Sequence, residues 1–347
     1  MYTNTTRIFI FLLLFNCGQD KSKEIDEKKH SISVRNAHSM IYNSDESKVY
    51  LFGGANSKEV LSDLWYLDGV NWNMVILENS PLARTFASMV YDKNEKRIIL
   101  FGGSKVLFGK ETKIQNLLND TWQFKNSKWT KLNTKNPPLP RAEASIVYDE
   151  HRKKIILFGG YTIQNGEYIK LGDTWEFYDN NWRLISDSGP SKRNGASMVY
   201  DTKNKYTVLF GGSTADKQYG KSKGETWIWK SKKWGKIKTE QPNGIFNTNM
   251  IYDKNKNQIF RFGGWNGDLR INETWSYINN KWSKLNLKTK PLPRNHSNMV
   301  YDEKQKKIIL FGGHDGENVF GDLWEFSNNE WKNIFEYTPI KRQSNSH

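Results

Sequence analysis

Short apolar runs recur along this chain, and six of them end at a pair of glycines. Runs that are apolar at consecutive positions, such as Ile98–Phe101 and Ile155–Phe158, predict strands buried on both faces. The gaps between successive glycine pairs are 49, 57, 52, 52 and 49 residues, which indicates one unit of about 50 residues repeated six times. The paired glycines, to which we assign a structural role, are Gly53, Gly54, Gly102, Gly103, Gly159, Gly160, Gly211, Gly212, Gly263, Gly264, Gly312 and Gly313.

Three further strands complete each repeat. Upstream of the apolar run lies a segment such as Ser88–Asp92 or Asn298–Asp302, and a polar turn joins the two as a hairpin. Downstream, every repeat has two tryptophans seven residues apart with turn-forming residues between them, so a second hairpin is predicted to bring the two rings close together. The first tryptophans, with a structural role, are Trp65, Trp122, Trp175, Trp227, Trp275 and Trp324; the second are Trp72, Trp129, Trp182, Trp234, Trp282 and Trp331.

A four-stranded unit of this kind cannot bury its aromatic face alone. The sequence therefore predicts an all-β fold, a six-bladed β-propeller with four antiparallel strands in each blade. The pattern Arg…Ser-Met-Val-Tyr-Asp…Phe-Gly-Gly…Asp-x-Trp…Trp resembles the kelch-repeat propeller family over about residues 35–335, and the whole chain resembles a bacterial kelch-type lipoprotein. We place the propeller at residues 32–337 and a tail at 338–347. Whether residues 31–34 or the segment after Trp331 add a closing strand stays open.

The N-terminus predicts export. Ile8–Phe15 is an apolar run too short to span a bilayer, which is typical of a signal peptide over residues 1–16. Its end resembles a lipoprotein lipobox, with Cys17 as the lipidated first mature residue and residues 17–31 as a flexible tether. The alternative is an ordinary signal peptide with an incidental Cys17. We expect a location in the bacterial cell envelope, at the outer membrane or cell surface, with membrane contact through the lipid anchor only.

The amino-acid composition limits the partners and the kinds of site that we expect. The net charge of +15 could indicate a nucleic-acid partner. The lysines, however, are mixed with acids in turn-like segments spread evenly along the chain. We therefore expect these lysines to form a solvated surface, and we expect no nucleic-acid partner. An anionic surface or polysaccharide partner remains open. The single cysteine excludes disulfides and cysteine-based sites in the repeats. No catalytic residue, metal site or cofactor is predicted, and we expect a monomer.

The loop after the glycine pair varies in length. From the second glycine to the first tryptophan the spacing is 11 residues in repeats one, five and six, 19 in repeat two and 15 in repeats three and four. Insertions collected on one face indicate a binding face, and aromatic and cationic residues there suit a protein or glycan ligand. The alternative is that these side chains fold back over the end of the propeller. The candidates are Phe108, Tyr161, Tyr168, Tyr219, Trp265, Arg270 and His314.

An arginine recurs eight residues before the end of each Tyr-Asp or Tyr-Asn pair, except in repeat five, where Ile245 replaces it. An acid recurs two residues before each first tryptophan. One hypothesis is structural Arg–carboxylate pairing that ties blades together. The other is an arginine ring that binds a ligand carboxylate, which the resemblance to kelch propellers implies. The same resemblance leaves open an alternative to a binding scaffold, an enzyme of the sialic-acid mutarotase type. The arginines are Arg35, Arg84, Arg141, Arg193 and Arg294.

Overall fold

We describe the fold from a computed structural model of the chain. It describes residues 32–107, 113–214, 224–238, 241–335 and 340–341, and the compact unit of the chain begins at Ile32. The predicted signal peptide, Cys17 and the tether lie outside the described residues.

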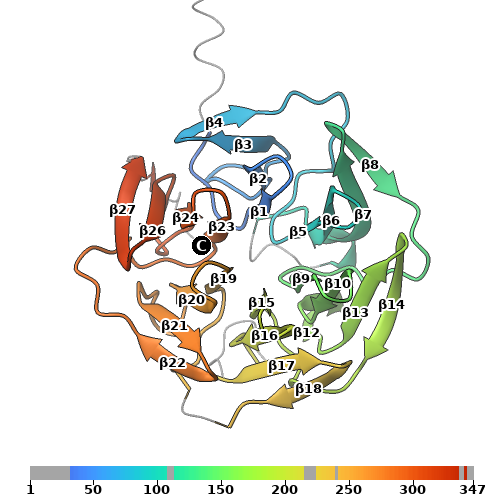
Figure 1. The fold of residues 1–347 in the computed structure, drawn as a ribbon. Coiled ribbons are helices and arrows are strands. Elements are labelled where there is room, and N and C mark those ends of the chain that lie inside the picture. Colours follow the sequence, from blue (N-terminus) through green and yellow to red (C-terminus); the bar gives the residue numbers. More distant parts are fainter. Residues whose placement is uncertain (1–31, 108–112, 215–223, 239–240, 336–339, 342–347) are drawn as a thin grey trace, which may run out of the picture. The chain divides into compact units, whose positions relative to one another are not determined.

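Six four-stranded antiparallel sheets form a ring, so the predicted six-bladed β-propeller is confirmed (Figure 1). Every blade takes its four strands from one repeat, with the first strand innermost. The strands are β1 (Ser39–Asn43), β2 (Lys48–Phe52), β3 (Leu64–Asp68) and β4 (Asn71–Met74) in blade one; β5 (Ser88–Asp92), β6 (Arg97–Ser104), β7 (Leu117–Lys125) and β8 (Lys128–Leu132) in blade two; β9 (Ser145–Asp149), β10 (Lys154–Phe158), β13 (Thr174–Tyr178) and β14 (Asn181–Ser186) in blade three; β15 (Ser197–Asp201), β16 (Tyr206–Phe210), β17 (Thr226–Lys230) and β18 (Lys233–Lys236) in blade four; β19 (Asn249–Asp253), β20 (Gln258–Phe262), β21 (Thr274–Ile278) and β22 (Lys281–Lys284) in blade five; β23 (Asn298–Asp302), β24 (Lys307–Phe311), β26 (Leu323–Ser327) and β27 (Glu330–Phe335) in blade six.

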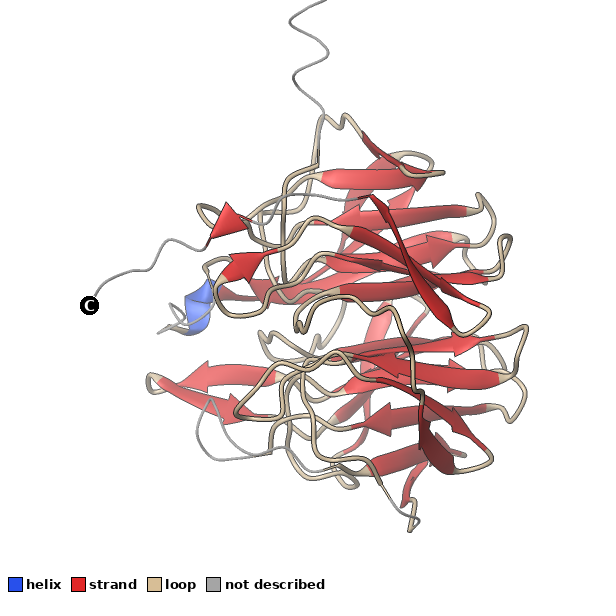
Figure 2. Ribbon diagram, turned by 90° about the vertical axis from the view of Figure 1, so that its left-hand side faces the viewer, coloured by secondary structure: helices blue, strands red, loops and turns tan. Residues whose placement is uncertain are grey.

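The two ends of the ring differ. Because each blade is an antiparallel meander, the loops after the glycine pairs and the connections between blades lie at one end, which we call the mouth face. The tight turns between first and second strands, and between third and fourth strands, lie at the other, which we call the floor face. The small elements η1 (Ile114–Asn116), β11 (Tyr161–Gln164), β12 (Glu167–Lys170), β25 (Asn318–Val319) and β28 (Ile340–Lys341) project on the left of Figure 2, at the mouth face.

Side-by-side packing closes the ring between blades six and one. The Arg35 amide donates to Phe320 O at 3.0 Å, and Gly313 donates to Arg35 O at 2.9 Å. Neither candidate segment adds a strand to a blade, since β28 pairs only with β25 in a separate two-stranded sheet. The open question of the closing strand is thereby answered among the described residues.

The second tryptophan of each blade is the main contact with the preceding blade. It packs on the phenylalanine that precedes the glycine pair of that blade, with ring centroids 4.8–5.4 Å apart. The two tryptophans of one repeat lie in the same apolar cluster, as the predicted hairpin requires, but they are not directly opposite each other: Trp72 pairs with Leu67, and Trp65 with Met74. The six ring pairs are Phe52–Trp129, Phe101–Trp182, Phe158–Trp234, Phe210–Trp282, Phe262–Trp331 and Phe311–Trp72.

A threonine of the preceding blade accepts a hydrogen bond from this tryptophan at four of the six junctions. Trp331 Nε1, for example, donates to Thr274 Oγ1 at 2.9 Å. Blades one and six have Leu64 and Leu323 in place of the threonine, and there the indole nitrogens of Trp129 and Trp72 have no partner among the described residues. Both junctions of blade one therefore lack this bond.

The glycine pairs allow close approach between blades. Gly102 has a φ of 67°, and a Cβ atom there would lie 2.8 Å from Arg141 O. A side chain would thus meet the backbone of the next blade as well as the strain of a left-handed conformation.

Candidate functional site

The five repeated arginines lie inside the protein, not on its surface. Their side chains are 0% exposed, and each forms an ion pair with the acid of its own blade at 2.6–2.8 Å. Arg294 shows the geometry: Nη1 and Nη2 donate to the two carboxylate oxygens of Asp322 at 2.6 and 2.7 Å, and Nη1 also donates to Gly312 O. The carboxylate accepts a further bond from Trp324 Nε1 at 2.7 Å.

The same arginines join neighbouring blades. The backbone of Arg294 belongs to the preceding junction, where its carbonyl accepts the Gly264 amide and its amide donates to Ile271 O. Its side chain, in contrast, is held within blade six. The geometry supports structural pairing that ties blades together. The mutarotase hypothesis needed one of these five guanidiniums at the surface, and the described structure offers none of them.

The ion pairs hold their acids ionised. Burial by itself raises the pKa of the Asp173 carboxyl, but the hydrogen bonds and charge of Arg141 outweigh it and lower that pKa below its ordinary value. The pKa values of Asp63 and Asp120 are lowered by the same balance.

In blade five, a lysine replaces the repeated arginine as the partner of the acid. Ile245 leaves Glu273 without an arginine, and Lys284 pairs with it instead. An arginine returns at Arg261, at the position of a buried leucine in the other blades, between the rings of Phe210 and Trp275. Burial lowers the pKa of the Arg261 guanidinium to about 10, an effect that the charge of Glu273 opposes.

A ring of six residues surrounds the mouth of the central channel. Each lies two positions after the arginine position of its blade, with a φ between 52° and 62°. Five backbone hydrogen bonds of 2.7–3.2 Å run from one to the next around the ring. We call these residues the mouth ring: Ala37, Phe86, Glu143, Gly195, Asn247 and His296.

Polar side chains of the mouth ring meet across the channel. Asn247 Nδ2 donates to His296 Nε2 at 2.6 Å, so Nδ1 of that imidazole carries the proton and donates to His314 Nε2 at 2.9 Å. His296 Nε2 lies 3.8 Å from Glu143 Oε1, although the two residues come from opposite blades. Asn194 donates to the other Glu143 oxygen at 2.5 Å. The mouth is thus crossed by a connected polar network.

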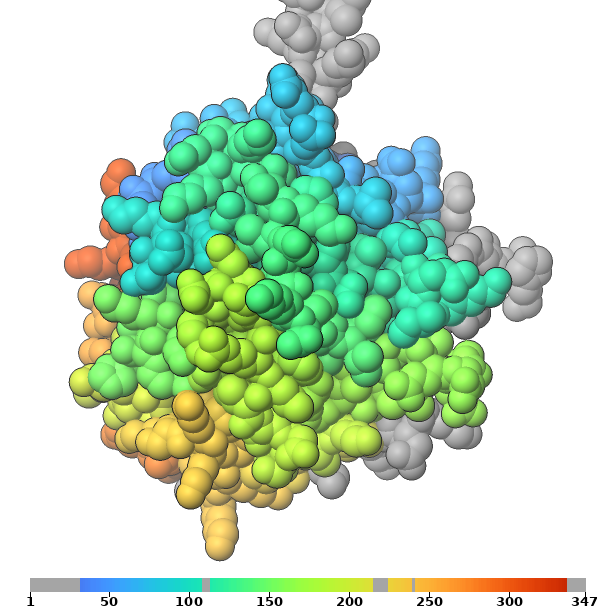
Figure 3. Space-filling model, turned by 90° about the vertical axis from the view of Figure 1, so that its right-hand side faces the viewer, coloured from blue at the N-terminus to red at the C-terminus, as the bar shows by residue number. Residues whose placement is uncertain are grey.

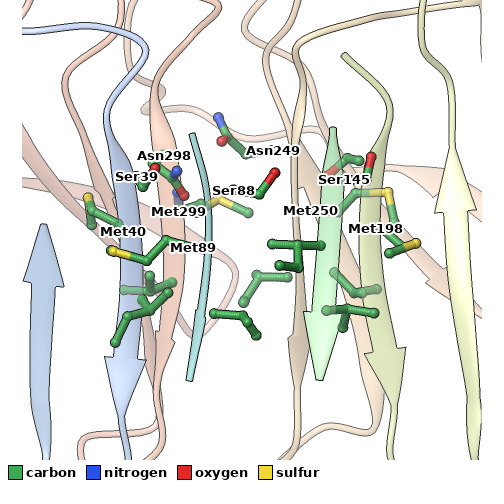
Figure 4. Close-up of a pocket in the computed structure, with 18 of the residues that line it drawn as sticks. Ser39, Met40, Ser88, Met89, Ser145, Met198, Asn249, Met250, Asn298 and Met299 are labelled. Atoms are coloured by element: carbon green, nitrogen blue, oxygen red, sulfur yellow. The ribbon is translucent and has the colours of Figure 1, made fainter. Parts of the chain in front are cut away.

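Behind the mouth ring, the channel has a volume of about 390 Å³. A belt of serine and asparagine side chains ties neighbouring inner strands, as in the bond from Ser88 Oγ to Ala144 O at 2.9 Å. Below it, methionines from five blades line the wall (Figure 4). These are Met40, Met89, Met198, Met250 and Met299.

Four charged residues cross the channel at the floor face. Lys93 and Lys254 each lie 2.8–2.9 Å from both Glu150 and Glu303, so the four form a closed ring of salt bridges between blades two, three, five and six. The channel therefore has a polar network at the mouth and an ionic network at the floor.

The candidate loop residues are more buried than a binding face requires. Tyr161 and His314 are each 2% exposed, which agrees with the alternative that these side chains fold back over the end of the propeller. Tyr168, Trp265 and Arg270 are partly exposed, and Arg270 stacks 5.1 Å above the Trp265 ring. Phe108 and Tyr219 lie outside the described residues. The loops of blades two and three, coloured teal and light green, project on the right of Figure 3.

Sequence reasoning missed two features of this face. The mouth ring was missed because its residue types differ in every repeat; its constant offset from the arginine was the available signal. The second is a set of exposed apolar residues on the mouth-face loops and connections. These are Ile76, Leu82, Ile114, Leu139, Leu269 and Leu292.

The burial of His38 predicts that the stability of the protein depends on pH. It stands where other blades have Ala87, Ala144 and Ala196, and its ring packs 5.6 Å from the Phe311 ring at the junction that closes the propeller. Burial, and then the charge of Arg35, lower the pKa of His38 well below 6.5. The unfolded chain therefore binds a proton that the folded chain excludes, so stability falls as pH drops below about 6.5.

We expect His38→Ala to gain stability relative to the parent, by about 1 kcal/mol for each pH unit between pH 6.5 and 5.5. Urea unfolding of both proteins at several pH values measures this difference. His151→Ala, at an exposed turn, is the control. A constant difference between parent and His38→Ala across this range would contradict the prediction.

The described part of the chain contains no group of three His, Cys, Asp or Glu residues arranged to hold a metal ion. Within the same residues, no helix has the length and apolar character to cross a membrane.

Comparison with known proteins agrees with the architecture. The family model described as KLHDC2/KLHL20/DRC7 Kelch-repeats domain matches residues 2–190 and 153–347. No curated protein matches the chain. The two matched segments span nearly the whole sequence, and the chain belongs to the kelch-repeat family.

Proposed function

We propose that this chain is an exported, lipid-anchored binding scaffold that holds a protein ligand on its mouth face. The kelch propeller fold fits a protein-binding scaffold. The observation that carries the proposal is the placing of three exposed leucines, Leu82, Leu139 and Leu292, each two residues before a buried arginine.

The arginine fixes the backbone of each leucine. Nε of Arg84, Arg141 and Arg294 donates to the carbonyl of the leucine two positions earlier, at 2.9–3.1 Å. The leucines are thus held on rigid backbone although their side chains are exposed. Apolar side chains presented in this way lose little entropy on binding, which suits anchors of a protein interface.

The chain itself supplies the matching substitution, since Ser33 and Ser191 occupy the same position in blades one and four. We expect a triple Leu→Ser variant at 82, 139 and 292 to fold normally and to bind its partner at least tenfold more weakly. Val70, Leu184 and Ile278, exposed away from these connections, give the control when changed to serine.

The parent would be screened against individual purified envelope proteins and against acidic and neutral glycans, and each ligand titrated with both variants. A protein whose affinity falls only in the mouth-face variant supports the proposal. A glycan ligand that is insensitive to the leucines would overturn it.

The proposed location rests on the sequence alone, because the only cysteine of the chain lies at the end of its only long apolar run. Labelling with a radioactive fatty acid tests it. Cys17→Ala should abolish incorporation and release the protein from the membrane fraction, while an unlabelled parent would contradict lipid anchoring.

A further inference from the structure

The floor face of blades four and five gathers lysines that are far apart in the sequence. Three turns form this part of the surface. Two belong to blade four, between β15 and β16 and between β17 and β18, and one belongs to blade five, between β21 and β22. Six lysines in these turns are exposed. We call them the lysine patch: Lys203, Lys205, Lys230, Lys232, Lys233 and Lys281.

No exposed acid accompanies the lysine patch. The acid in these turns is Asp201, which is 6% exposed, and Asp253 in the adjacent turn between β19 and β20 is 4% exposed. Their carboxylates accept backbone amides of the turn, as from Asn204 N to Asp201 Oδ1 at 2.9 Å. They therefore shape the turn and present little negative charge to solvent. The even mixture of lysines and acids along the sequence does not persist on this part of the folded surface.

The turns of the lysine patch are held close together. Lys230 Nζ lies 5.9 Å from the Tyr206 ring, directly after Lys205. A hydrogen bond joins the Tyr252 hydroxyl of blade five to the backbone of Lys203 in blade four. Like charges held at neighbouring turns repel each other in the free protein, and an anionic partner relieves that repulsion.

The residue types indicate which anion fits. Every cation of the patch is a lysine, whose compact charge attracts an anionic surface without the paired geometry by which arginine recognises single carboxylates or phosphates. The neighbouring rings of Trp229 and Trp282 are buried in the blades, so they offer no platform on which nucleic-acid bases could stack. The patch consists of short turns at one end of two sheets, which suits a broad charged plane.

We propose that the lysine patch docks the propeller on an anionic membrane surface. On the opposite side of the ring, blade one lies across from blade four (Figure 1). Its floor acids Asp45 and Glu46 are paired with Lys96 and Lys48, and Asp68 is exposed, so this side has no comparable excess of positive charge. Attraction at blades four and five would therefore tilt the ring onto the lysine edge. This contact is separate from the mouth face and adds to any lipid anchor, whereas the sequence predicted contact through the anchor only.

The test uses the full chain and vesicles of phosphatidylcholine with or without 30% phosphatidylserine. The patch variant changes Lys203, Lys205, Lys232 and Lys233 to glutamine. The control variant changes four exposed lysines elsewhere, Lys58, Lys113, Lys135 and Lys288, so that both variants lose the same net charge. Binding to the neutral vesicles measures the contribution of the apolar N-terminal run, and this value is subtracted from the binding to the anionic vesicles.

We expect the anionic lipid to increase binding of the parent and the control, and the patch variant to bind the anionic vesicles at least about tenfold more weakly. Raising the salt concentration should remove the difference. Equal losses in both variants would show an effect of net charge alone and overturn the proposal. A patch-dependent affinity for duplex or single-stranded DNA without vesicle binding would overturn it in favour of nucleic acid. The patch variant should keep its mouth-face partner, which separates this test from that of the proposed function.

Discussion

Changing Arg294 to methionine should lower the free energy of unfolding by about 3–5 kcal/mol. The substitution removes both bonds to Asp322, and it leaves that carboxylate largely buried beside Trp324 with its charge uncompensated. It also removes the donor to the Gly312 carbonyl. Urea unfolding followed by tryptophan fluorescence would measure the loss.

Two further variants separate the ion pair from simple packing. Asp322→Asn should restore part of the stability when combined with Arg294→Met, because the buried charge is then absent. Ile245→Met, at the blade-five position that lacks the arginine, should change stability by less than about 1.5 kcal/mol. If Arg294→Met were as mild as Ile245→Met, the arginine would not be a structural tie, and a ligand role would need to be reconsidered.

Changing Trp331 to alanine should cost about 3–5 kcal/mol, because the side chain fills the junction between blades five and six. Its ring packs between Phe262 and Phe326 at 5.1 and 5.0 Å, it is 1% exposed, and its indole donates to Thr274. The loss should be measured as a lower urea concentration at the midpoint of unfolding.

Trp72→Ala provides the matched comparison at the junction that closes the ring. Trp72 is only half-buried, and Leu323 replaces the threonine acceptor, so a smaller loss is expected. Equal losses at the two positions would mean that neither burial nor the Thr–Trp bond distinguishes the junctions.

Features that repeat in the sequence were the ones that could be predicted from it. The glycine pairs, the tryptophans and the inner strands occur once in each repeat, and together they determine six blades and their strand order. The neighbours of the second tryptophan could not be predicted, because a hairpin of the right length still allows Trp72 to pair with Leu67 of its own blade and to pack on Phe311 of the preceding one. Register and neighbour contacts depend on turn geometry that spacing alone does not define.

The candidate site was harder, because it depends on residues that differ between repeats and meet only in the ring. Glu143 and His296 belong to opposite blades, and the salt bridges of Lys93 and Lys254 also join different repeats. The arginines were recognised as repeated, but only the structure distinguishes a surface ring from buried ties. Tyr161 and His314 show the converse case, since an aromatic or imidazole in a long loop can still be buried.

The absence of strand exchange between the first and last blades, among the described residues, bears on how the protein folds. Each blade forms from a continuous stretch of chain, so its pairings are local and can form one repeat at a time. Contacts such as Asn298 Nδ2 to His38 O and the Lys304 amide to the Tyr42 hydroxyl join residues separated by 260 and 262 positions. They can form only after the whole propeller has been synthesised. Until then the first blade exposes one unpartnered aromatic surface, so docking of blade six onto blade one completes the core.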